Sequence, residues 1–184
     1  MKRRTVYIYQ KDNNQETLVS FLGGYSGFEI TIIDRYLKLT ESDPLAATDW
    51  NHLREKCLEE LVTDICLFVV PITPNFVLEP ILKVMPMIGF GVYTIESIIP
   101  KIVLEGIHDV RNGLRNYYYN TFGAEIIQTV QGFIKANLNQ SVAAKQLYLH
   151  RNTLNYRIDH FIAYSEINVK SFFGAYAFYL LFNT

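Results

Sequence analysis

Residues 140–158 read QSVAAKQLYLHRNTLNYRI, and this stretch has the spacing of a helix-turn-helix. Two small residues, Ala143 and Ala144, suit a close crossing of two helices, where larger side chains would not fit. Four aliphatic residues supply the apolar contacts that fix the angle between the helices: Leu147, Leu149, Leu154 and Ile158. The pattern therefore predicts one short helix over about 141–148 and a second over about 152–164.

The start of the second helix is suited to a nucleic acid. Ser141 is predicted to cap the first helix and Asn152 the second. The N–H groups and positive dipole end at a free helix N-terminus favour a phosphate, and the first turns of such a helix can enter a major groove. Arg151 and Arg157 are expected to point outward. The predicted exposed face consists of Arg151, Asn152, Asn155, Tyr156 and Arg157, and Ser141 is added from the first helix.

The motif also carries a family resemblance. Leu147-Tyr148-Leu149-His150-Arg151-Asn152-Thr153-Leu154, followed by Tyr156-Arg157, resembles the signature of the PucR/CdaR group of bacterial transcriptional regulators. The resemblance extends from Ile126 to Leu181 and implies a Fis-like DNA-binding domain. It also implies that the positions from His150 to Arg157, Thr153 included, face the DNA. Many other helix-turn-helix proteins have glycine in the turn, where this chain has Tyr148.

The preceding residues predict a different fold class. Residues 1–95 alternate β-rich runs with helical patterns, which indicates an α/β domain with a small, mostly parallel sheet. Strands are expected at 5–9, 28–33, 65–70 and 90–95. Regulators of this group usually carry a longer sensory region with a degenerate GGDEF-like domain, which residues 1–120 do not match. The domain is therefore interpreted as sensory or as a dimerisation domain.

The α/β domain is a candidate binding site for a small-molecule effector. The carboxyl ends of parallel strands form a crevice in many α/β proteins, and the residues that follow the predicted strands there are Gln10, Asp34 and Thr73. No catalytic constellation or cofactor fingerprint accompanies them, so the chain is predicted not to be an enzyme and to need no cofactor. The four histidines and two cysteines lack the spacing of metal ligands.

From residue 96 to the end the pattern is helical. A connecting helix is expected from Ser97 to Tyr117, within a linking region of residues 96–120. The all-α helix-turn-helix domain then occupies 121–184, with helices at about 124–136, 141–148, 152–164 and 171–182. The last of these is apolar almost all round, and with Tyr117, Tyr118 and Tyr119 it predicts a homodimer interface. Contact with the chain's own α/β domain is the alternative.

Charge and hydropathy restrict the functional classes. The net charge is −1, but residues 121–184 hold five Lys/Arg against three Asp/Glu, so that basic charge gathers around the motif. The apolar runs are too short for a signal peptide or a membrane span, and a cytoplasmic protein without a membrane partner is expected. The predicted function is transcriptional regulation by a homodimer on an inverted repeat of double-stranded DNA. A protein-interaction module that kept the fold without binding DNA is the alternative.

Overall fold

The computed structural model describes residues 3–12, 14–25, 27–43, 48–73 and 75–183. The chain divides into two compact units. The first unit comprises Met1–Ile72 and Leu78–Thr94, and the second unit comprises Thr73–Val77 and Ile95–Thr184.

The first unit contains a five-stranded sheet with the order β2-β3-β1-β4-β5. The strands are β1 (Thr5–Gln10), β2 (Phe28–Ile33), β3 (Tyr36–Glu41), β4 (Ile65–Val69) and β5 (Gly91–Tyr93). β1 pairs antiparallel with β3 and with β4, β2 pairs antiparallel with β3, and β4 with β5 is the parallel pair. The prediction of a mostly parallel sheet is therefore wrong.

The difference comes from a hairpin that the sequence pattern concealed. β3 pairs back onto β2 through the two residues Asp34 and Arg35, with Ile33 opposite Tyr36. Asp34 has a φ of 52°, which belongs to the left-handed region used in tight hairpin turns. Leu37 and Leu39 of β3 are buried. Tyr36–Glu41 was not among the predicted strands, yet it lies in the interior of the sheet, between β2 and β1.

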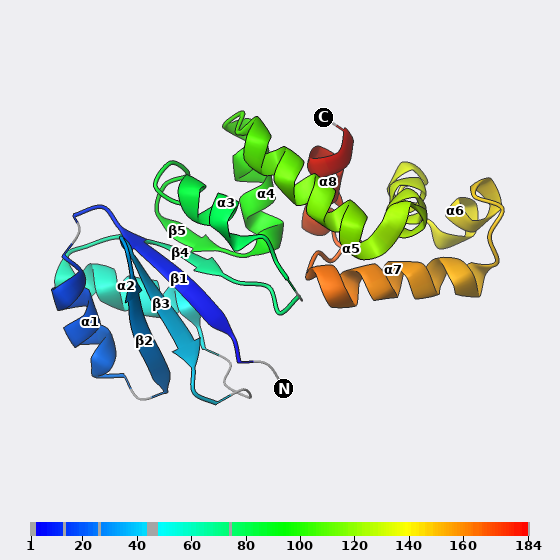
Figure 1. Ribbon diagram of the computed structural model, residues 1–184. Coiled ribbons are helices and arrows are strands. Elements are labelled where there is room, and N and C mark those ends of the chain that lie inside the picture. Colours follow the sequence, from blue (N-terminus) through cyan, green and yellow to red (C-terminus); the bar gives the residue numbers. More distant parts are fainter. Residues whose placement is uncertain (1–2, 13, 26, 44–47, 74, 184) are drawn as a thin grey trace. The chain divides into compact units, whose positions relative to one another are not determined.

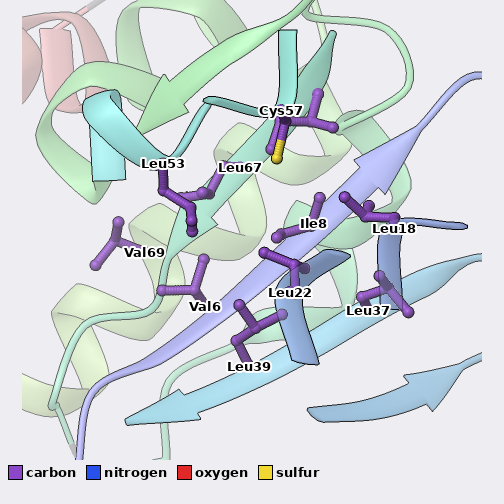
Figure 2. Close-up of a cluster of buried hydrophobic side chains, with 11 residues drawn as sticks. Val6, Ile8, Leu18, Leu22, Leu37, Leu39, Leu53, Cys57, Leu67 and Val69 are labelled. Atoms are coloured by element: carbon purple, nitrogen blue, oxygen red, sulfur yellow. The ribbon is translucent and has the colours of Figure 1, made fainter. Parts of the chain in front are cut away.

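Helices cover one face of this sheet. The first unit contains α1 (Gln15–Gly23), α2 (Trp50–Leu61) and α3 (Leu78–Val84). α1 and α2 lie on the same face (Figure 1). The buried cluster between them and the sheet joins side chains from both layers, as Figure 2 shows. Its fully described members are Val6, Ile8, Leu18, Leu22, Leu37, Leu39, Leu53, Cys57, Ile65, Leu67 and Val69.

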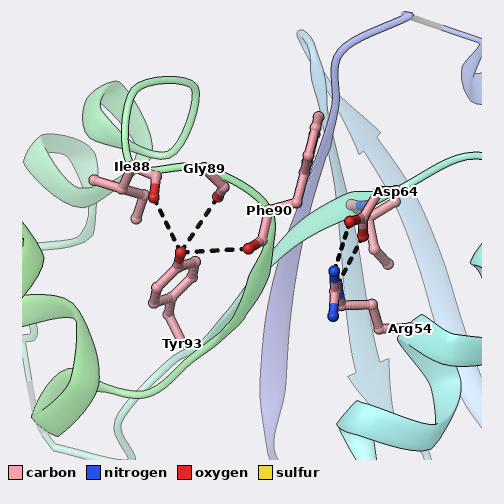
Figure 3. A network of polar contacts seen from close by, with 7 residues as sticks. Arg54, Asp64, Ile88, Gly89, Phe90 and Tyr93 are labelled. Carbon is pink, nitrogen blue, oxygen red and sulfur yellow. Dashed lines mark hydrogen bonds and ion pairs between the residues drawn. The ribbon is translucent and has the colours of Figure 1, made fainter.

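Polar side chains tie the elements of the first unit together (Figure 3). Arg54 of α2 donates from Nε and an Nη atom to the two carboxylate oxygens of Asp64, at 2.7 and 2.5 Å. This hydrogen bonding raises the pKa of Arg54. The hydroxyl of Tyr93 in β5 donates to the carbonyl of Ile88 at 3.0 Å. These contacts connect α2 to the start of β4, and β5 to the loop that follows α3.

The second unit is helical. Its elements are α4 (Ile95–Leu104), α5 (His108–Lys135), α6 (Gln140–Gln146), α7 (Arg151–Ser165) and α8 (Phe172–Asn183). The helices predicted at 141–148, 152–164 and 171–182 are confirmed to within two residues at each end, and the one predicted at 124–136 is the part of α5 that follows Gly123. Among the described residues, the helices are too short or too polar to cross a membrane.

Glycine interrupts the helical run at two places. The single helix predicted from Ser97 to Tyr117 is divided, because Gly106 has a φ of 68° between α4 and α5. Gly123 then has a φ of 76° and a ψ of 161° inside α5, so that the helical segments are 108–122 and 124–135. Glycine adopts such a backbone at little steric cost, whereas other residues would not.

Candidate nucleic-acid interface

The crossing of α6 and α7 rests on small and aliphatic side chains. Ala143 is fully buried and Ala144 is nearly so. Leu154 and Ile158 of α7 are fully buried, while Leu147 and Leu149 are half-buried. Gly132 of α5 lies directly against Leu147, since an added Cβ would come within 2.7 Å of its Cδ1. The predicted close crossing is confirmed, and α5 supplies a small residue of its own.

The caps of both helices differ from the prediction. Asn139 caps α6, and its Oδ1 accepts from the N–H groups of Ser141 and Val142 at 3.0 and 3.1 Å. His150 caps α7, and its Nδ1 accepts from the N–H of Asn152 at 3.2 Å. Ser141 and Asn152 are therefore not the caps, because each helix begins earlier than the apolar pattern indicated. The side chains of both residues are exposed at the helix starts.

The cap also fixes the chemistry of His150. A ring nitrogen that accepts a hydrogen bond is unprotonated, so the proton of the neutral imidazole is on Nε2. The residue is exposed beside the N-terminus of α7. A histidine cap therefore adds a donor to the amide groups of the first turn, where the helix dipole already favours negative charge.

The predicted DNA-contacting residues separate into two groups. Arg151, Asn152, Thr153 and Tyr156 are exposed on the first turns of α7. Asn155 is half-buried, and its Oδ1 is buried without a hydrogen-bond partner among the described residues. The structure thus leaves the first four exposed to solvent and partly withdraws the fifth.

Arg157 does not point outward as expected. Its side chain is 17% exposed, and one Nη donates to Glu125 Oε1 at 2.8 Å. The other Nη donates to the hydroxyl of Thr129 at 3.2 Å. Both partners belong to the 124–135 segment of α5. Arg157 therefore connects α7 to the 124–135 segment of α5.

Tyr148 is a surface residue that the sequence reasoning did not include among the predicted contacts. It lies in the turn between α6 and α7, has a φ of 54° and is 96% exposed. A non-glycine residue in the left-handed region is disfavoured by roughly 1 kcal/mol or more. A strained backbone that displays a fully exposed aromatic ring beside the start of α7 is typical of a functional position. Tyrosine in place of the usual turn glycine was the available signal.

The predicted effector crevice is not assembled in the first unit. The Nε2 of Gln10 donates to the hydroxyl of Thr63 at 3.0 Å, in a buried contact. Asp34 lies in the hairpin turn. Because β4 runs antiparallel to β1, the carboxyl end of β4 and the carboxyl end of β1 lie at opposite edges of the sheet. The crevice expected at the carboxyl ends of parallel strands is therefore not formed by β1 and β4, the strands that Gln10 and Thr73 follow.

The described residues were also compared with the predictions for metal ligands and for the two cysteines. Within the described residues, no three His, Cys, Asp or Glu side chains gather closely enough to hold a metal ion. Cys57 and Cys66 are both free and buried. Burial raises the pKa of Cys57 to about 11 and that of Cys66 to about 12. Both therefore remain protonated thiols at neutral pH.

Only part of the predicted dimer surface is exposed in the structure. Tyr117 and Tyr118 are buried inside the second unit, where the ring of Tyr117 contacts Phe76 at 5.6 Å between ring centroids. These two tyrosines are unavailable to a partner, and that part of the prediction is wrong. Exposed aromatic side chains are instead displayed by α8, with Phe172 at 74% and Phe173 at 72% exposure.

Comparison with known proteins agrees with this geometry. Residues 126–183 match the PucR C-terminal helix-turn-helix domain, which confirms the resemblance of this segment. The chain is 40% identical over 91 residues to the uncharacterized protein YxkF of Bacillus subtilis (strain 168), covering 48% of this chain and 31% of YxkF. It is 35% identical over 57 residues to the DNA-binding transcriptional activator AdeR of the same organism, covering 31% of this chain and 14% of AdeR.

A solved structure extends the likeness to the first unit. The regulator of polyketide synthase expression from Bifidobacterium adolescentis aligns with a TM-score of 0.50 and 16% identity, covering 98% of this chain and 78% of that chain. At this identity the likeness concerns the fold. The matches to the curated relatives span less than a third of each relative. Residues 126–183 are thus a PucR-type helix-turn-helix domain, of a kind found in transcriptional regulators.

Proposed function

We propose that the chain is a DNA-binding transcriptional regulator that acts as a homodimer on an inverted-repeat site. The observation that carries this proposal is the exposed N-terminus of α7, where Arg151 and Asn152 face solvent within a PucR-type helix-turn-helix domain. Residues 121–184 bind the DNA in this proposal, and residues 1–95 have a sensory or dimerising role. The role is regulatory rather than catalytic, and its DNA target places the protein in the cytoplasm.

The exposed side chains match the chemistry of base edges and phosphates. Arg151 can bond bidentately to guanine, and Asn152 can bond bidentately to adenine. Thr153 and Tyr156 offer further hydroxyl groups on the same turns. Contacts to phosphate oxygens come from helix N-termini and from neutral donors as well as from cations. Ser141, His150 and Tyr148 flank the helix start and are assigned to the DNA backbone.

Arg157 and Asn155 have a different role. Arg157 is a positioning residue, since its guanidinium is engaged by Glu125 and Thr129. Asn155 is partly buried on the inner side of α7. Both orient the exposed turn without needing to touch the DNA.

Charge favours a dimer over a monomer. Within α6 and α7 of the described chain, the exposed basic side chains are Lys145 and Arg151. Neutralisation of phosphates supplies much of the affinity of a DNA-binding protein, and so few cations support weak binding. A two-fold dimer doubles them and sets two recognition helices about 34 Å apart, one helical turn of DNA. The aromatic residues of α8 are the surface that we assign to this dimer.

DNA selection tests the central claim. Fragments retained from a genomic library by the full chain are footprinted, and the affinity of an Arg151→Ala, Asn152→Ala variant is compared with wild type. Each bidentate contact is worth about 1–3 kcal/mol, so a loss of about 100-fold is expected. Lys101→Ala, which removes an exposed cation on α4, is the matched control and leaves affinity nearly unchanged. Equal protection by the double variant would remove α7 from the interface.

Sedimentation tests the dimer separately. Phe173→Asp places a charge on the exposed aromatic surface of α8 and is expected to shift a wild-type dimer to monomer. The footprint is expected to shrink from an inverted repeat to one half-site at higher protein concentration. A wild-type monomer that protects an asymmetric half-site would contradict the dimer while leaving DNA binding intact.

One observation favours a second candidate function. Because Arg157 is held by Glu125, the recognition surface is less basic than its sequence indicates. A helix-turn-helix that binds another protein would fit such a surface. Failure to retain any fragment even at low salt, where phosphate contacts are strongest, would support this alternative.

A further inference from the structure

A cavity of about 500 Å³ lies within the second unit. The cavity is bounded by the 108–122 segment of α5, by α7, and by Thr73 and Asn75. Its walls are mainly aromatic and come from Tyr117, Phe122, His160 and Tyr164. Hydroxyl and amide groups, including those of Thr73 and Asn120, complete the lining. Among the described residues that line it, none is Asp, Glu, Lys or Arg.

His160 contributes a polar atom that the fold does not use. Its Nδ1 is buried and has no hydrogen-bond partner among the described residues. The ring lies 4.7 Å from that of Tyr164 and meets Phe122 edge-on at 6.0 Å, measured between centroids. Because Nδ1 has almost no accessible surface, His160 lines the cavity with its ring, and an occupant would reach this nitrogen only after the ring moves.

The cavity touches the two elements that position the DNA-contacting turn. His160 and Tyr164 are on α7, the helix whose first turn carries Arg151. Phe122 immediately precedes Gly123, where α5 is interrupted. The segment beyond that interruption holds Glu125, which binds Arg157 of α7. An occupant of the cavity would therefore contact both the recognition helix and the hinge of its support.

We propose that this cavity binds a small, uncharged, planar aromatic compound, and that its occupancy sets the position of α7 against α5. Aromatic walls favour a flat ring by offset or edge-on contact. The uncharged lining offers an ionised ligand no counter-charge, whereas the hydroxyl and amide groups orient a neutral polar substituent. The regulatory half of this inference rests on the proposed DNA binding, but the binding half does not.

Three probes of similar size test the ligand class. Benzamide is planar and uncharged, benzoate is planar and anionic, and cyclohexanecarboxamide is uncharged and not planar. Each is titrated into the full chain without DNA, and binding is followed by the NMR signals of the His160 and Tyr164 rings. Benzamide is expected to saturate at millimolar concentration, with the other two at least tenfold weaker. Benzoate binding as tightly as benzamide would overturn the assigned class.

Two tryptophan variants test whether benzamide binds in the cavity. Asn120→Trp fills the cavity from an exposed position of α5, and Asn116→Trp adds the same ring at an exposed position one turn earlier, outside the lining. The first is expected to weaken benzamide at least tenfold, and the second to leave its affinity unchanged. Tyr164→Ala, which removes one aromatic wall, gives a second reading if Asn120→Trp does not fold. Equal affinity in all variants, or no saturable shift in wild type, would overturn the site.

The coupling to α7 is read in the same titration. Saturation with benzamide is expected to shift the backbone amide signals of residues 151–157, which lie outside the cavity. Shifts confined to the lining residues would overturn the coupling while leaving the binding site. Since no DNA is present, loss of the proposed DNA binding would alter neither result.

Discussion

The first unit and the start of α7 use their polar side chains differently. In the first unit, Arg54 bonds to Asp64 and Tyr93 bonds to a loop carbonyl, so that polar groups join one element to the next. At the start of α7 in the second unit, Arg151 and Asn152 make no such contribution and face solvent. Side chains that the fold does not need are free to bind a partner, and this is why we propose that the start of α7 contacts DNA.

The largest expected effect tests the sheet side of this comparison. Leu39→Ala should lower the free energy of unfolding by about 3 kcal/mol, because the side chain is fully buried in β3 and the change leaves a cavity. Ile32→Ala, at a position of β2 that is 53% exposed, should cost much less. The single tryptophan, Trp50, contacts Phe28 in the first unit, and its fluorescence during urea unfolding reports both variants. Similar losses would mean that β3 is not part of the core.

The next effect compares two arginines on one helix. Arg157→Ala should lower the free energy of unfolding by about 1–2 kcal/mol, because it removes hydrogen bonds to Glu125 and Thr129 and the packing of a mostly buried side chain. Arg151→Ala should change stability by less than about 0.5 kcal/mol, since its side chain is exposed. Urea unfolding followed by far-ultraviolet circular dichroism measures both.

The same pair has the opposite ranking in DNA affinity, where the Arg151 variant is expected to lose more. A variant of Arg151 that destabilises the chain as much as that of Arg157 would show that the exposed arginine also supports the fold. The division of labour within α7 would then be wrong.

Local patterns explain which parts of the fold could be predicted. The α6–α7 pair is specified by spacing within residues 140–158, and contacts between near neighbours in the sequence fix its apolar face. Both predicted cap positions were two residues too late. The capping residue is the last extended residue before the helix, which residue type alone does not identify; Ser141 and Asn152 resemble caps only by type. Tyr148 was recognisable as unusual in the sequence, but its exposure depends on the three-dimensional fold.

Non-local pairing explains what could not be predicted. β3 carries Lys38 and Glu41 among its apolar residues, and the identity of its partner strands depends on a turn at Asp34 rather than on its own composition. The engagement of Arg157 with Glu125 spans 32 residues of sequence and likewise leaves no local signal. An aromatic count could not separate Tyr118, which is buried, from Phe173, which is exposed.

The smallest effect concerns Tyr148, where stability and function are expected to move in opposite directions. Tyr148→Asn should raise the free energy of unfolding by about 0.5–1 kcal/mol, because asparagine tolerates the left-handed backbone better than tyrosine does. The ring is 96% exposed, so little packing is lost with it. The same change should weaken binding to the selected DNA about three- to tenfold, since it removes an aromatic side chain beside the start of α7.

Tyr156→Asn is the matched control, because Tyr156 is also exposed but lies inside α7 with an ordinary helical backbone. Asparagine and tyrosine have similar helix propensities, so this change should not stabilise the chain. Urea unfolding of both variants separates the backbone effect from loss of a ring, and DNA titration is applied to the Tyr148 variant. A Tyr148→Asn chain that is more stable and binds DNA as well as wild type would leave the strained turn without a role in binding. Stabilisation accompanied by weaker binding would mean that the turn retains tyrosine for contact with DNA at the expense of stability.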